Sequence, residues 1–225
     1  MSNLNYWKEI KLLDKFFLKI LKKNRLKIHD IFLKNIDYNN SMSILDVGTL
    51  SSSDENHNII LQKLKDNPNI TCLSDQNCSS LKEYYPHVKS FIIGDGKKNI
   101  FDNNLFDIVY SSATIEHVGS LENQLSFVSE CFRVAKKSVF ISTPNRNYPF
   151  DFHTKLPLIH LLPKNIHRKI LKKIGLSFFS KEENLNLMAE KDLINICTKL
   201  KIKNYYIAKH KFCFFTSNLI LIINK

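Results

Sequence analysis

Short apolar runs alternate with helical patterns through the middle of the chain. The runs are rich in Ile and Val and are bounded by Gly, Asp, Asn or Pro, which is typical of buried strands. They comprise Ser43–Val47, Asn69–Leu73, Val88–Ile93, Phe106–Tyr110 and Ser138–Ser142. Helical spacing of apolar residues lies between them, at Asn56–Leu64 and Leu121–Val134. Strands that alternate with helices predict right-handed crossovers and a parallel, doubly wound α/β sheet.

The last third of the chain departs from this alternation. Four prolines punctuate the sequence after Thr143, and a helix is expected to end near Gly175. We therefore predict one domain over residues 43–225 that carries an insertion at about 144–188. A helix at Ala189–Leu200 is followed by strands at Lys203–Ala208 and Phe214–Ile223. No helix separates these two strands, so they are expected to form an antiparallel hairpin at the edge of a seven-stranded sheet.

The first 42 residues are predicted to form helices that pack on this domain. The pattern predicts helix over Leu4–Ile36 with a break near Asn24, and its apolar positions comprise Leu13, Phe16, Phe17, Ile20 and Leu21. A basic stripe accompanies them, made of Lys8, Lys11, Lys15, Lys19 and Lys22. Such a stripe is usually a solvated face. With Trp7 it would also suit peripheral contact with an anionic membrane, and both interpretations stay open.

Composition places the chain among ordinary globular proteins. It has 225 residues, of which 44% are hydrophobic and 24% charged. The formal net charge of +12 invites a nucleic-acid partner, but only four of the 33 cations are arginine and the lysines are scattered. Arginine supplies the fork that phosphates and base edges prefer. The charge is therefore interpreted mainly as compositional drift, and nucleic acid is not the expected partner.

The five cysteines are scattered and form no Cys-x-x-Cys pair, so neither a metal site nor a disulfide framework is expected. Met1–Ile10 lacks the continuous apolar run of a signal peptide. No apolar run approaches the ~20 residues of a membrane-spanning helix. These observations predict a soluble protein of the reducing cytoplasm.

Candidate chemistry follows the strands, because open parallel sheets bind ligands beyond the carboxyl ends of their strands. The residues found there comprise Asp46 and Gly48 after the first strand, Asp75 after the second, Asp95 and Gly96 after the third, and Ser111, Glu116 and His117 after the fourth. Gly48 permits a close backbone approach to a ligand, Asp75 could accept ribose hydroxyls, and Asp95 could accept an exocyclic amine. A plain turn at Gly48 and another at Asp95 are the competing interpretations. The fingerprint G-x-G-x-x-G is absent, which argues against nicotinamide and flavin enzymes.

The order of these residues along the chain resembles that in class I S-adenosylmethionine-dependent methyltransferases, which have a Rossmann-like fold. The resemblance is closest to the type 11 group, through Phe106–Val109, Ile115–Val118, Glu130–Val134 and Thr143–Arg146. The tract Thr143–Pro163 resembles a bacterial subgroup often encoded near genes for surface polysaccharides or other specialised small molecules. A single glycine after the first strand departs from the usual Gly-x-Gly. The spacing from Gly48 to Asp75 is also longer than usual, so a neighbour of Asp75 could bind the ribose.

The resemblance implies S-adenosyl-L-methionine as cofactor and a small-molecule acceptor, with a sugar or sugar-linked metabolite favoured. It implies a cofactor site at Asp46, Gly48, Asp75, Asp95, Gly96 and Ser111. His117 is the first candidate for a general base and His153 the second, although His117 could instead be structural. Glu116 and Arg146 are candidates for acceptor binding, and Arg146 could equally pair with Asp151. The insertion would cap the acceptor site.

Two other functions stay open at this point. One is a non-catalytic module of the same fold that binds an anionic partner through its lysines. The other is a methyltransferase with a nucleic-acid acceptor, against which the chain has no Asn-Pro-Pro-Tyr-like tetrapeptide after the fourth strand. Fold alone does not identify an acceptor.

Overall fold

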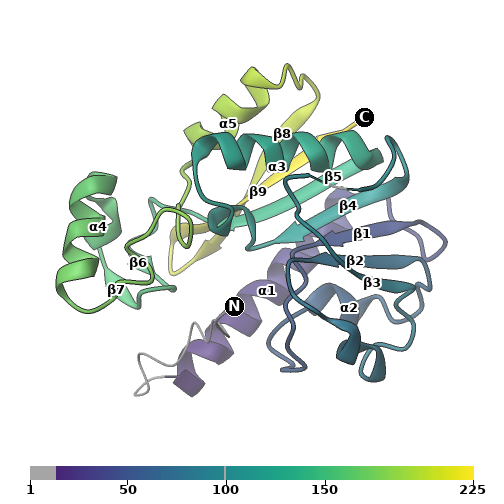
Figure 1. Cartoon of the computed structure of the whole chain (residues 1–225), viewed down its shortest axis with the longest axis horizontal. Helices are drawn as coiled ribbons and strands as arrows, with labels where there is room; N and C mark the ends of the chain where they lie inside the picture. The colour runs from purple at the N-terminus through teal and green to yellow at the C-terminus, as the bar shows by residue number, and fades with distance from the viewer. Residues whose placement is uncertain (1–13, 99) are drawn as a thin grey trace.

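The computed structural model describes residues 14–98 and 100–225, with side chains from residue 18 onward, and its centre is one seven-stranded sheet (Figure 1). The strand order is β3-β2-β1-β4-β5-β9-β8. The strands are β1 (Ile44–Val47), β2 (Ile70–Ser74), β3 (Ser90–Ile93), β4 (Phe106–Ser112), β5 (Ala135–Pro144), β8 (Tyr205–Phe212) and β9 (Phe215–Asn224). The first five run parallel, and β9 is antiparallel to both β5 and β8. This confirms the predicted Rossmann-like sheet with its C-terminal hairpin.

Helices cover both faces of the sheet. The helices are α1 (Asp14–Asn35), α2 (Ile59–Lys63), α3 (Leu121–Val134), α4 (Lys164–Lys173) and α5 (Glu190–Lys199). Short 3-10 turns lie at Ser79–Glu83, Ile115–His117 and Ile159–Leu161. In Figure 1, α3 and α5 lie above the sheet and α1 and α2 below it. The alternation along β9 builds both cores, because Leu221 packs with the α3 and α5 residues whereas Ile222 packs with those of α1 and α2.

The N-terminal helix differs from its prediction. Within the described residues α1 runs unbroken through Asn24, whose side chain is buried at 5% exposure. The distance from Asn24 Oδ1 to His210 Nε2 is 3.2 Å. His210 thus provides a hydrogen-bond partner for Asn24 in place of water, so this asparagine does not end the helix. The core contact is made by Ile28, Phe32 and Ile36.

Part of the basic stripe lies outside the described residues. Lys8 and Lys11 belong to that part, and so does the side chain of Lys15. Lys22 forms a 3.0 Å ion pair with Glu55, and Lys19 is exposed. Membrane contact through the stripe stays a prediction. Within the described chain, no helix is long and apolar enough to cross a membrane.

The insertion forms a lobe beside the sheet, at the left of Figure 1. It contains the two-stranded ribbon of β6 (Phe150–Asp151) and β7 (Leu156–Pro157), followed by α4. It has its own small core, which comprises Leu171, Leu176, Phe179, Leu185 and Leu187. These contacts hold the lobe together independently of the main core. Its role as an acceptor-site cap stays a prediction.

Candidate active site

A cavity of about 650 Å³ opens at the carboxyl ends of β1, β2, β3 and β4. Its wall contains the predicted residues Asp46, Gly48, Asp75, Asp95, Gly96, His117 and His153. The strands β1 and β4 are neighbours in the sheet although they are distant in sequence, so the strand order reverses here. Open α/β sheets bind their ligands at this kind of switch point. The structure therefore brings most of the predicted site residues to one place.

Gly48 allows the turn after β1 to meet the loop after β4. Its φ of 94° lies in the region that favours glycine. A β-carbon here would lie 2.8 Å from Thr114 Cβ and closer still to the rest of that side chain. The Gly48 N–H donates to the carbonyl of Leu73 at 2.8 Å, which fixes the turn against β2. Gly48 thus serves both the turn and the close packing of the cavity wall.

The loop after Gly48 is held by an asparagine instead of a second glycine. Asn58 Oδ1 accepts from the Leu50 N–H at 3.1 Å, and its Nδ2 donates to the carbonyls of Leu50 and Ser52. Asn58 itself has a left-handed φ of 49°, and α2 begins only at Ile59. The helix predicted from Asn56 therefore starts later. Leu50 and Asn58 both line the cavity.

The three predicted cofactor acids differ in their surroundings. Asp46 is buried and its Oδ2 accepts from Thr49 Oγ1 at 2.7 Å, while burial raises the pKa of Asp46 to about 6. Asp75 is exposed, and its neighbour Gln76 also lines the cavity. Burial favours a higher pKa for Asp95, but its hydrogen bonds and ion pair with Lys97 outweigh burial and lower that pKa. Asp95 therefore belongs both to a turn and to the cavity wall.

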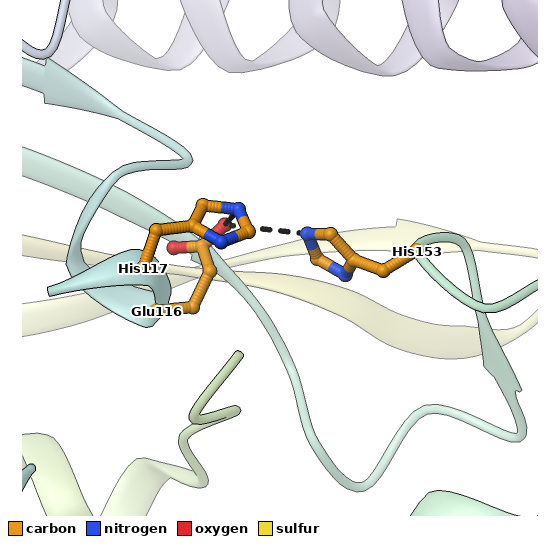
Figure 2. Close-up of side chains that lie close together, drawn as sticks. All are labelled: Glu116, His117 and His153. Atoms are coloured by element: carbon orange, nitrogen blue, oxygen red, sulfur yellow. Dashed lines mark ion pairs between the residues drawn. The ribbon is translucent and has the colours of Figure 1, made fainter. Parts of the chain in front are cut away.

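Glu116, His117 and His153 meet at the other end of the cavity and are called the Glu–His cluster here (Figure 2). The Glu116 side chain is fully buried, and its Oε2 accepts from Thr143 Oγ1 at 2.9 Å. Its Oε1 has no hydrogen-bond partner and lies 3.9 Å from His117 Nε2 and 3.8 Å from His153 Nε2. Figure 2 shows that the two imidazoles approach the carboxylate from different segments: His117 is next to Glu116 in the turn after β4, and His153 comes from the insertion. The insertion therefore supplies one member of the cluster.

Each histidine is oriented by a hydrogen bond at its Nδ1 atom. His117 Nδ1 lies 2.6 Å from the Asn184 carbonyl oxygen, and His153 Nδ1 lies 3.1 Å from Asp151 Oδ1. Burial lowers the pKa of His117, although the negative charge of Glu116 acts to raise it. Burial also acts to lower the pKa of His153, but contact with Asp151 outweighs it and raises that pKa. His117 is thus the more readily neutral imidazole of the pair.

The cavity wall does not include three of the predicted residues, namely Ser111, Glu116 and Arg146. Ser111 is fully buried and its Oγ donates to the Val47 carbonyl at 2.8 Å, so it ties β4 to β1. Arg146 donates to the carbonyls of His160 and Leu162 within the insertion. Cofactor binding by Ser111 and acceptor binding by Arg146 stay predictions.

Three further residues line the cavity that the sequence did not single out for a site, namely Arg25, His57 and Phe179. Arg25 comes from α1, and its guanidinium donates to the Asn56 carbonyl. An arginine keeps its charge in proteins, so α1 brings a cation to a cavity that otherwise carries carboxylates. A lone arginine in a basic helix has no local signal that marks this role.

Comparison with known proteins bears on the class. Residues 59–142 match the family model described as a methyltransferase domain. A methyltransferase structure from Aquifex aeolicus is 13% identical with a TM-score of 0.59, and the match covers 92% of this chain and 97% of that one. Magnesium protoporphyrin IX methyltransferase from Synechocystis, solved with bound S-adenosylhomocysteine (SAH), is 14% identical with a TM-score of 0.58, over 96% and 88% of the chains. Comparison with curated protein sequences found no match.

These similarities agree with the sheet order and the cavity. At such identities the solved structures establish the fold. The family match indicates a methyltransferase domain over residues 59–142 of the chain.

Proposed function

We propose that this protein transfers a methyl group from S-adenosylmethionine to a small-molecule acceptor in the cytoplasm, with a sugar or surface-polysaccharide precursor as the favoured acceptor class. The observation that carries the proposal is that one cavity is lined by five of the predicted cofactor residues and by both histidines of the Glu–His cluster. Its volume of about 650 Å³ lies within the range of small-molecule sites. The acceptor class rests on the resemblance of Thr143–Pro163 to the bacterial subgroup.

The cofactor end is assigned to the turn at Gly48 and the residues after β2 and β3. Asp75, Gln76 and Asp95 line the cavity. In the proposed complex, Asp75 and Gln76 bind the ribose hydroxyls and Asp95 accepts from an exocyclic amine. S-adenosylmethionine, when bound, supplies a methyl group on a sulfonium whose leaving group is a thioether. The main task left to the protein is alignment, because proximity and orientation provide much of the acceleration.

The acceptor end is assigned to the Glu–His cluster and the neighbouring insertion. His117 and His153 line the cavity, and Phe179 adds an apolar surface beside them. A hydroxyl placed here would meet imidazole nitrogens that are already oriented by Asn184 and Asp151. The insertion then acts as a cap, because it provides His153 and Phe179 to the wall.

The proposal is tested first by calorimetric titration with S-adenosylmethionine and with SAH. We expect saturable one-to-one binding of both. Absence of binding at millimolar ligand would contradict the enzyme and favour a non-catalytic module of the same fold.

Turnover is tested by SAH formation with a panel of nucleotide sugars and other hydroxylated small molecules. His117→Ala should keep SAH affinity and lower turnover by about 100-fold or more, the range of acid–base and orienting groups. His87→Asn, outside the cavity wall, is the matched control. Unchanged turnover in His117→Ala would reject a role for this imidazole, and methylation of RNA or DNA in place of small molecules would reject the acceptor class.

A further inference from the structure

We propose that Glu116, His117 and His153 form a binding site for a divalent transition-metal ion of the Zn²⁺ class at the acceptor end of the cavity. One ligand atom from each lies within 4.8 Å of the others. The sequence predicts no metal site, because it has no closely spaced cysteines and His153 lies far from Glu116 along the chain. The inference rests on the proposed function only for the position of the acceptor.

The protonation of the two imidazoles leaves electron pairs that point toward Glu116. A carbonyl oxygen only accepts, so His117 must donate from Nδ1 to Asn184. His153 likewise donates from Nδ1 to the carboxylate of Asp151. In a neutral imidazole the other nitrogen then carries a lone pair. Both Nε2 atoms face Glu116 Oε1, so three electron-rich atoms converge.

Glu116 strengthens the case because its charge is buried. The side chain is fully buried and its Oε1 has no hydrogen-bond partner. Leaving a buried polar group unsatisfied costs about 1–3 kcal/mol, and more when the group is charged. A cation between Oε1 and the imidazoles would satisfy this oxygen and would remove the repulsion between the three electron pairs.

The distances are close to those of a bound ion. Ligand atoms of a tetrahedral zinc site lie about 3.3 Å apart, because Zn–N and Zn–O bonds are about 2.0–2.2 Å. The separations of 3.9 Å and 3.8 Å from Glu116 Oε1 would need to close by about half an ångström.

Each ligand residue also has a second partner that holds it in place. Asp151 holds His153, the Asn184 carbonyl holds His117, and Thr143 holds the second oxygen of Glu116. Metal-binding histidines almost always donate their other N–H to a carboxylate or a carbonyl, as here. Two imidazoles and one carboxylate suit Zn²⁺, and three protein ligands leave a position for a substrate oxygen. An acceptor hydroxyl on that position would lose its proton to water more readily.

The test uses the full-length protein stripped of metal with a chelator and titrated with Zn²⁺ or Co²⁺ alone. We expect one ion per chain by calorimetry, and a visible absorption band when Co²⁺ is used. His153→Ala and Glu116→Gln should weaken binding by about 100-fold or more, since each removes a ligand. His57→Gln removes another cavity histidine outside the cluster and should change metal affinity by less than about twofold.

Asp151→Asn provides a second measurement that removes no ligand. It should weaken metal affinity by about 10–100-fold, as loss of a supporting partner does. Failure of Zn²⁺ to bind in the micromolar range would overturn the site, and so would equal affinity in wild type, Glu116→Gln and Asp151→Asn. SAH binding is measured on the same samples. SAH binding without metal binding rejects the metal site alone, whereas metal binding without SAH binding rejects only the proposed function.

Discussion

His117 Nδ1 and the backbone carbonyl of Asn184 lie 2.6 Å apart, and this contact joins the loop after β4 to the end of the insertion. A second link lies beside it, where the Asn186 N–H donates to the Glu116 carbonyl at 2.7 Å. Gln124 on α3 closes the arrangement, because its Nε2 donates to the carbonyls of Ile115 and Asn186. The insertion therefore fixes the orientation of the Glu–His cluster through backbone atoms.

Replacement of Gln124 by Leu tests this arrangement. Gln124 is 1% exposed, so Gln124→Leu would leave two buried carbonyls without their donor. We expect the free energy of unfolding to fall by about 1–3 kcal/mol, measured by urea denaturation. Gln62→Leu is the matched control, because Gln62 also donates to two carbonyls but is only half-buried. A Gln124→Leu protein as stable as Gln62→Leu would contradict the structural role.

Replacement of Gly48 by Ala should disturb both the fold and the cofactor end. The substitution combines an unfavourable φ with a clash against Thr114, and we expect a loss of about 2–4 kcal/mol in the free energy of unfolding. SAH affinity should also fall, because the turn lines the cavity. Gly175→Ala separates the two effects: its φ is 86°, yet nothing lies within 4 Å of the added carbon. Equal losses in the two variants would show that Thr114 moves aside.

The sequence predicts the sheet well because each buried strand has a local signal. The run at Phe106–Tyr110 is mostly apolar and is followed by two serines, and β4 covers the run and both serines. The same holds for α3, whose apolar face predicts its bounds and whose first turn is capped by Ser120 in the structure. Signals that depend on tertiary partners are the ones missed. Asn24 looks like a break until His210 provides its partner.

The candidate site is only partly predictable for a similar reason. Residues directly after strands reach one cavity because the parallel topology places them there, as for Gly48 and Asp95. The approach of His153 to Glu116 depends on how the insertion folds, which no local pattern encodes. Arg146 has the right chemistry for an anionic acceptor, but it lies outside the cavity wall and donates to backbone carbonyls of the insertion.

The raised pKa of Asp46 predicts a pH-dependent stability. Its folded pKa of about 6 exceeds the ordinary value of 3.8, so between these values the folded state holds a proton that the unfolded state has lost. The free energy of unfolding of the wild type should therefore fall as pH rises from about 4 to 6. Asp46→Asn keeps an acceptor for Thr49 and removes the titration. The variant should gain up to about 3 kcal/mol relative to wild type between pH 4 and pH 7.

Urea denaturation at several pH values checks this sign, with the difference between the two proteins as the quantity of interest. Other carboxylates titrate in both proteins and cancel in that difference. A difference that does not change with pH, or one that falls as pH rises, would contradict a buried Asp46 with a raised pKa.

Arg25 should bind the carboxylate of the amino-acid portion of the cofactor. It lines the cavity, and its guanidinium has a backbone carbonyl as its partner, which leaves donors for an anion. Arg25→Met keeps the apolar stem and removes the charge, so SAH affinity should fall by about 10–100-fold, the worth of a hydrogen bond to a charged group. Methylthioadenosine lacks the carboxylate, and calorimetry should show its affinity unchanged. An equal fall for both ligands would mean that Arg25 acts by holding the Asn56 loop and does not meet the carboxylate.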